Sequence, residues 1–173
     1  MISKQRRALK APELFHVGFL VADIEAARNQ FEAVLGIAFH PTTAVDLTVE
    51  TMHHPVPHAY RSKLCYSVQG PVFVELVEAD HSDYKSLSQG ERIHHLGYWV
   101  DDVAALRERQ KDEGLRDEVI VRYQGSDRIR QWFTDPVSMH GVRAEYFDSD
   151  WRPEFEAWMA DWTKGASTVG GSI

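Results

Sequence analysis

The sequence predicts an α+β fold in which two βαβββ modules in tandem form a curved mixed sheet around a metal site, with an added C-terminal helix. A nine-residue segment, HVGFLVADI at residues 16–24, returns as HLGYWVDDV at residues 95–103, with His, Gly, Val and Asp in the same register. Each half also contains an apolar strand-like run with a glutamate in its middle, at residues 72–77 and 142–147. Such self-similarity is the signature of a duplicated structural unit, and 173 residues suffice for one domain built of two small modules.

The first module begins with a strand over residues 14–21. Alternation would place Phe15, Val17, Phe19 and Val21 on one face and His16 and Gly18 on the other. A helix should follow, since Asp23 can cap it and Gly36 can stop it. Its apolar positions recur at helical spacing, and they are Ile24, Ala27, Phe31, Val34 and Leu35. Three further strands are expected over residues 46–51, 62–68 and 72–78.

The second module repeats this order. Asp101 or Asp102 should cap a helix that begins with Val103 and ends at Gly114. Strands are expected over residues 118–123, 129–134 and 142–147, and turns at the Gly-Pro and Asp-Pro steps precede the two glutamate strands. The predicted organisation is an N-terminal extension (1–13), a first module (14–80), a polar connection, a second module (92–148), a C-terminal helix (149–164) and a flexible tail (165–173).

The C-terminal helix carries an aromatic stripe, because Phe155, Trp158, Met159 and Trp162 fall at helical spacing. We expect this stripe to cover the protein's own core rather than a dimer contact. The tail that follows is rich in glycine and small residues, which predicts disorder.

The composition excludes several classes of partner. A net charge of −7 without a basic stripe disfavours nucleic acid and anionic membrane surfaces. The amino terminus is basic but lacks the apolar segment of a secretory signal, and no apolar run is long enough to span a bilayer. The single cysteine, Cys65, lies in an apolar run and is read as a core residue; together these features favour a cytoplasmic protein.

The candidate metal site consists of His16, Glu75, His95 and Glu145. Glu75 and Glu145 lie within apolar strands, where an ionised carboxylate must be paired, protonated or bound to a cation. Two neutral imidazoles and two carboxylates form a set suited to a divalent first-row metal, and their two negative charges balance its two positive ones. The alternative is a pair of buried Glu/His hydrogen bonds between the modules.

Other residues compete for a role in the site. His94 adjoins His95, and in a regular strand the two would face opposite sides; the repeat register selects His95 as the ligand. His53, His54 and His58 are interrupted by prolines, which predicts a solvated loop that could act as a lid. The sequence leaves open whether this loop or Glu50 takes part. His140, in the turn before Glu145, is expected only to shape that turn.

The order His16, Glu75, His95, Glu145, with each residue on a strand of a repeated βαβββ unit, resembles the vicinal oxygen chelate superfamily. This superfamily includes glyoxalase I, methylmalonyl-CoA epimerase and the extradiol dioxygenases. The resemblance covers residues 14–147, and the segments FTDP (133–136) and HGVRAE (140–145) look like the family's closing turn and last metal strand. A glutamate at position 75 looks like glyoxalase I, while the short spacing fits the epimerase-like members.

The resemblance implies a divalent-metal-dependent isomerase, epimerase or lyase that transfers a proton next to a carbonyl through an enediolate or enolate. It implies Zn, Ni, Co, Mn or Fe as the ion, a small carbonyl or thioester compound as the substrate, and a homodimer as the assembly. Glu145 would be the catalytic base, with Glu75 on the opposite side. Two alternatives stay open: an Fe(II) extradiol-type dioxygenase using His16, His95 and Glu145, and a non-catalytic protein that binds a small molecule such as an antibiotic.

Overall fold

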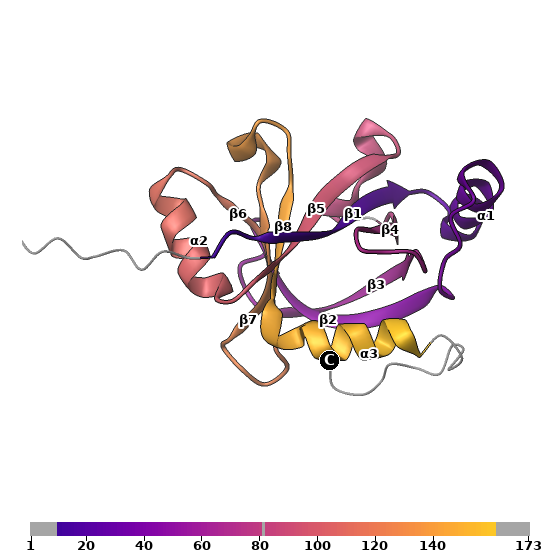
Figure 1. Ribbon diagram of the computed structural model, residues 1–173. Coiled ribbons are helices and arrows are strands. Elements are labelled where there is room, and N and C mark those ends of the chain that lie inside the picture. Colours follow the sequence, from indigo (N-terminus) through magenta and orange to yellow (C-terminus); the bar gives the residue numbers. More distant parts are fainter. Residues whose placement is uncertain (1–9, 81, 162–173) are drawn as a thin grey trace, which may run out of the picture.

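The computed structural model describes residues 10–80 and 82–161 and confirms the α+β prediction. Two modules follow one another along the chain, and Figure 1 shows their helices α1 and α2 at opposite ends of the sheet. The first module comprises β1 (Glu13–Val21), α1 (Ile24–Leu35), β2 (Thr43–Thr51), β3 (His58–Tyr66) and β4 (Phe73–Glu78). The second comprises β5 (Arg92–Val100), α2 (Val103–Asp112), β6 (Asp117–Arg122), β7 (Ile129–Thr134) and β8 (Ala144–Asp148).

The eight strands close into one curved sheet in the order β1-β4-β3-β2-β6-β7-β8-β5. Within each module the first and last strands pair in parallel, β1 with β4 and β5 with β8. The modules join through two antiparallel pairs, β1 with β5 and β2 with β6. The sheet therefore closes within a single chain, and β1 and β5, the two strands that carry the histidine candidates, are paired neighbours in it.

The cap residues predicted from the sequence mark the ends of the two helices. Asp23 accepts hydrogen bonds from the backbone N–H groups of Glu25 and Ala26, and Gly36 ends α1 with a left-handed φ of 69°. Of the two candidates in the second module, Asp102 is the cap. Ile24 and Ala27 of α1 are buried, whereas Val34 and Leu35 in its last turn are 72% and 61% exposed.

Strand alternation fails just before each candidate histidine. Between β1 and β5 the register shifts by one residue twice, and the extra residues are Phe15 on β1 and His94 on β5. A bulge of this kind turns two consecutive side chains toward one face. Phe15 therefore packs beside His16, with ring centroids 4.4 Å apart, instead of on the opposite face. The predicted opposition of His94 and His95 is wrong for the same reason, and their rings lie 5.2 Å apart.

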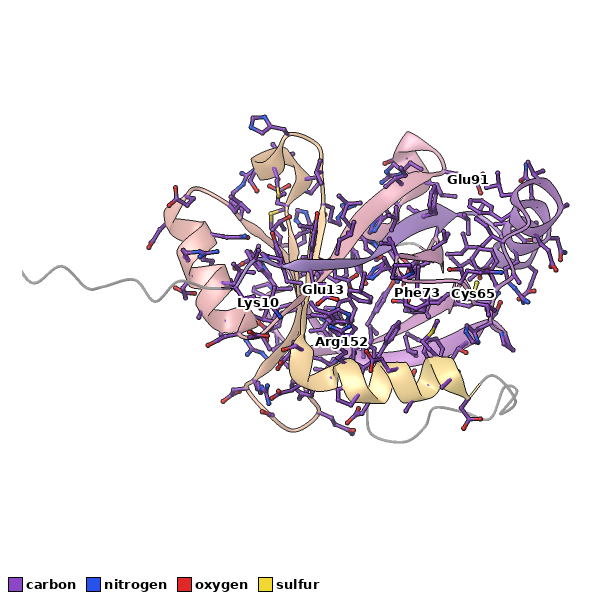
Figure 2. The ribbon with its side chains drawn as sticks, in the orientation of Figure 1. Lys10, Glu13, Cys65, Phe73, Glu91 and Arg152 are labelled. Atoms are coloured by element: carbon purple, nitrogen blue, oxygen red, sulfur yellow. The ribbon has the colours of Figure 1, made fainter. Side chains whose placement is uncertain are left out.

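The C-terminal helix α3 (Arg152–Ala160) follows a short 3-10 turn and lies alongside the sheet (Figure 1). Phe155 is buried among aromatic side chains of the sheet, with Trp158 and Met159 packed around it, so the helix covers the protein's own core as predicted. Arg152 forms an ion pair with Glu13 on β1, and Figure 2 shows the two side by side. Trp162 and the predicted tail lie outside the described residues. Across the described ranges, no helix is long and apolar enough to cross a membrane.

Candidate metal centre

The repeated His-x-Gly pattern has a tertiary explanation. On the paired strands β1 and β5, His16 lies opposite Gly97 and His95 lies opposite Gly18. A Cβ atom built on Gly97 would lie 1.8 Å from His16 Cε1, and one built on Gly18 would lie 2.1 Å from His95 Cε1. Each glycine thus provides the space that the histidine of the other module occupies.

The same register brings the two glutamates to the histidines. Gly18 pairs with Glu75 across β1 and β4, and Gly97 pairs with Glu145 across β5 and β8. Each glutamate therefore lies next to the glycine over which the other module's histidine packs. The structure brings all four predicted residues together from four strands of one chain.

The four side chains converge on a single point. One ligand atom from each of His16, Glu75, His95 and Glu145 lies within 4.8 Å of the others. His16 Nε2 is 2.8 Å from His95 Nε2 and 3.0 Å from Glu145 Oε2, while His95 Nε2 is 2.8 Å from Glu75 Oε2. All four residues are buried, with exposed fractions of 0 to 4%. Two acidic groups held this close without solvent need a cation between them.

A hydrogen-bond relay sets the tautomer of His95. The Tyr84 carbonyl oxygen, 2.6 Å from His94 Nε2, can only accept, so that nitrogen carries the proton. Burial, together with the charges of His95 and Arg143, keeps the pKa of His94 well below its usual value, so His94 is neutral and its Nδ1 accepts. His95 Nδ1, 2.9 Å away, must then donate. When His95 is neutral, the lone pair of its Nε2 therefore faces the cluster, as in a metal ligand.

The remaining donor set fits a bound divalent ion. Between residues 10 and 161, setting aside the undescribed residue 81, Glu75 Oε2 is a buried polar atom with no hydrogen-bond partner. Buried polar atoms are nearly always satisfied, so a carboxylate oxygen without a hydrogen-bond partner, within a cluster of possible metal ligands, indicates a missing partner. Two imidazole nitrogens and two carboxylate oxygens match the ligands of first-row divalent metals.

Electrostatics in the metal-free cluster lead to the same conclusion. Burial lowers the pKa of His95, but the carboxylates of Glu145 and Glu75 outweigh burial and raise that pKa to about 9. For Glu145, burial raises the pKa, but His95 and His16 outweigh it and lower the pKa to about 2. The cluster therefore retains a positive charge, a proton on His95, in the position where a metal ion would bind.

The cluster lies at the wall of a cavity of about 610 Å³. This volume suits a small-molecule ligand. Tyr66, the cross-strand neighbour of Glu75, also lines the cavity. Burial and the charges of Glu75 and Glu145 raise the pKa of its phenol well above the usual value, so Tyr66 keeps its proton at neutral pH and can donate a hydrogen bond. Trp151 and Trp158, from the 3-10 turn before α3 and from α3, form part of the cavity wall.

The other predicted candidates lie outside this site. Glu50 is ion-paired with Arg122 and is absent from the cavity wall, and His53, His54 and His58 are exposed away from it. His140 ends a 3-10 turn with a left-handed φ of 55°, in keeping with a role in the turn. Cys65 is fully buried, and burial raises the pKa of its thiol to about 12, so it is a core residue.

Three cavity or relay residues were not identified from the sequence: His94 as the partner of His95, and the buried cations Lys85 and Arg130. His94 and Arg130 were missed because register shifts orient them, and no sequence periodicity reports a register shift. Lys85 lies in the connection between the modules, which reads as polar and solvated.

Comparison with known proteins adds independent findings. Residues 15–130 match the family model described as the glyoxalase/bleomycin resistance protein/dioxygenase superfamily. The chain is 25% identical over 138 residues to the uncharacterized protein YqjC of Bacillus subtilis, covering 76% of this chain and 89% of that protein.

Several solved structures share the fold. A methylmalonyl-CoA epimerase from Streptomyces coelicolor, in complex with 2-nitronate-propionyl-CoA, is 24% identical with a TM-score of 0.56, covering 82% of this chain and 98% of that chain. The Mycobacterium tuberculosis methylmalonyl-CoA epimerase is 20% identical with a TM-score of 0.53, covering 86% and 92%. A hypothetical protein from Bacillus halodurans is 22% identical with a TM-score of 0.54, covering 80% and 95%.

Proposed function

Since the chain belongs to the glyoxalase/bleomycin resistance protein/dioxygenase superfamily, we propose that it is a divalent-metal-dependent isomerase, epimerase or lyase that transfers a proton next to a carbonyl group. The observation that carries this proposal is the buried convergence of two imidazole nitrogens and two carboxylate oxygens, with His95 offering a lone pair to it. His16, Glu75, His95 and Glu145 would hold the ion.

A divalent ion held there would supply a Lewis acid, which lowers the pKa of a C–H bond beside a carbonyl group. Glu145 would accept the proton, because its carboxylate lies at the cavity wall and is buried enough to be shielded from water. Glu75 lines the same cavity, and Tyr66 beside it can donate a hydrogen bond to a substrate oxygen. The burial of Glu75 and Glu145 strengthens each of these electrostatic interactions.

The substrate class we propose is a small carbonyl or thioester compound. A cavity of about 610 Å³ accommodates such a molecule. Methylmalonyl-CoA epimerases that share the fold have been solved with 2-nitronate-propionyl-CoA and with methylmalonyl-CoA, and both ligands are CoA thioesters. A CoA thioester therefore belongs in the first panel of compounds tested.

The test is solvent deuterium exchange in D2O with Glu145→Gln. Gln keeps an oxygen that can coordinate but cannot accept the proton, so we expect metal content to be largely retained while exchange falls about 10²- to 10⁴-fold. Carbon-bound deuterium beside the carbonyl is measured by NMR over a panel of carboxyacyl-CoA thioesters and 2-oxo acids. Metal content is measured on the same samples.

Glu50→Gln is the matched control, because Glu50 is a partly buried glutamate that is ion-paired with Arg122 outside the cavity wall. Its exchange rate should stay near that of the wild type. Exchange that survives Glu145→Gln but disappears in Glu50→Gln would move the base to Glu50. Oxygen uptake without carbon-bound exchange would replace the proposal with a dioxygenase, and absence of metal from the purified and metal-supplemented protein would favour a binding protein.

A further inference from the structure

Arg130 is a buried cation that a register shift turns toward the cavity. Between β6 and β7, Val121 pairs with Gln131 and Arg122 pairs with Ile129, so Arg130 is the extra residue of a bulge. Its neighbour Ile129 packs into the apolar cluster beneath α2, whereas Arg130 and Gln131 both line the cavity. Bulges next to functional sites commonly redirect a side chain in this way.

The guanidinium group of Arg130 lacks a counter-charge. Arg130 is only 2% exposed, and within the described part of the chain its Nε and Nη1 atoms have no hydrogen-bond partner. Its Nη2 reaches Gln131 Oε1 at 3.5 Å, and the group lies 5.2 Å from the ring centroid of Trp151. The aromatic contact satisfies the face of the guanidinium group but leaves the in-plane donors on Nε and Nη1 free.

The other cations at the cavity, Arg122 and Lys85, have closer partners for their donor groups. Arg122 is ion-paired with Glu50, and Lys85 donates to Ser62 Oγ at 2.5 Å and lies over the rings of Tyr60 and Tyr84. Glu154 of α3 lines the cavity but is exposed and forms no ion pair with Arg130. Glu75 and Glu145 are needed to balance a divalent ion. Asp46, also on the cavity wall, pairs with Arg61, so none of the described carboxylates that line the cavity forms an ion pair with Arg130.

Leaving a buried guanidinium group unpaired is costly, and an anionic ligand would remove that cost. We infer that Arg130 binds a carboxylate group of the ligand, so that the cavity takes an acid rather than a neutral compound. The planar guanidinium group matches the two oxygens of a carboxylate. The inference rests on the proposed function in one respect: the other end of the same ligand, which reacts, is taken to bind at the metal centre.

The experiment compares ligands that differ only in charge. The probes are the monohydroxamates of succinic, glutaric and adipic acid, each measured by calorimetry beside the same hydroxamate with its free carboxylate converted to an amide. We expect at least one acid to bind the zinc-loaded protein about 10- to 100-fold more tightly than its amide. In Arg130→Gln this ratio should fall to within about twofold of unity, while the affinity for the amide stays unchanged.

The matched control is Arg122→Gln, which removes the paired arginine of the same cavity and should leave the ratio intact. Arg130→Met tests folding, because replacing an unpaired buried cation with an apolar side chain should leave the melting temperature equal or higher. A merely structural arginine would lower it. The inference would be overturned if the wild type showed no preference for the acid, or if that preference survived Arg130→Gln. It would also be overturned if Lys85→Gln, instead of Arg130→Gln, abolished the preference.

A second arm separates this inference from the proposed function. After chelation and dialysis of the protein, the contribution of the hydroxamate to the binding affinity should disappear. The ratio of acid affinity to amide affinity should persist, because Arg130 is not a candidate metal ligand. If the hydroxamate contributes nothing even with zinc, the metal centre fails while the acid preference still reports on Arg130. If the ratio is unity with and without zinc, the Arg130 inference fails and the metal centre is unaffected.

Discussion

Gly97→Ala should strongly weaken metal binding although it replaces none of the four candidate ligands. A Cβ atom at position 97 would lie 1.8 Å from His16 Cε1 and 2.5 Å from His16 Nε2. An ordinary carbon–carbon contact is about 3.5 Å, so the imidazole ring must retreat by about 1.7 Å. A metal–ligand distance tolerates a change of only about 0.2 Å. His16 therefore leaves the cluster, and we expect the affinity for Zn²⁺ or Co²⁺ to fall about 10²-fold or more.

The assay is competition with a chromophoric chelator, followed by thermal unfolding of the metal-free protein. Overpacking should cost about 1–3 kcal/mol, which lowers the melting temperature by roughly 2–12 °C in a chain of this size. The control is the double variant His16→Ala/Gly97→Ala, in which the clash is gone. It should match His16→Ala alone in melting temperature and still bind no metal.

Gly18→Ala should behave likewise through His95, since a Cβ atom there would lie 2.1 Å from His95 Cε1. Wild-type metal affinity together with a wild-type melting temperature in Gly97→Ala would refute the reasoning, because it would show that His16 can bind metal without the space that the glycine leaves.

Further predictions concern the relay, the protons and the stoichiometry of the centre. His94→Leu removes the acceptor for His95 Nδ1 and should weaken metal binding about 10- to 100-fold, measured by the same competition. His94→Asn should recover part of this affinity. Equal metal affinities in the wild type and His94→Leu would exclude the relay. Because the carboxylates raise the pKa of His95 to about 9 against the effect of burial, metal must displace a proton from the metal-free protein. Affinity should rise about tenfold per pH unit up to that pKa and level off above it, and a flat profile from pH 6 to 9 would contradict this assignment. Since all four ligands come from one chain, metal analysis with light scattering should find about one ion per chain at every dilution, and metal loss that follows dissociation of an oligomer would show that the site is shared.

The sequence alone predicted the modules and the four site residues because these depend on repetition and local signals. The duplicated HxG segment reveals two copies of one unit, Asp23 and Gly36 mark the ends of α1, and glutamates inside apolar strands require a cation or a partner.

Only the tertiary structure decided how those residues meet and what surrounds them. Antiparallel pairing of β1 with β5 places each glycine under the histidine of the other module, which explains why the pattern contains a glycine at all. The single-chain closure of the sheet likewise depends on pairings between strands far apart in the sequence.

The orientation of individual side chains at the bulges also depends on the tertiary structure. An extra residue on β5 turns His94 toward His95, and one on β7 turns Arg130 into the cavity, in both cases against the period of two that a strand sequence implies. Whether a strand bulges depends on the register of its neighbours, which local sequence does not encode. The sequence by itself thus determined the four candidate site residues, and the packing of two modules determined the relay and the unpaired cation beside them.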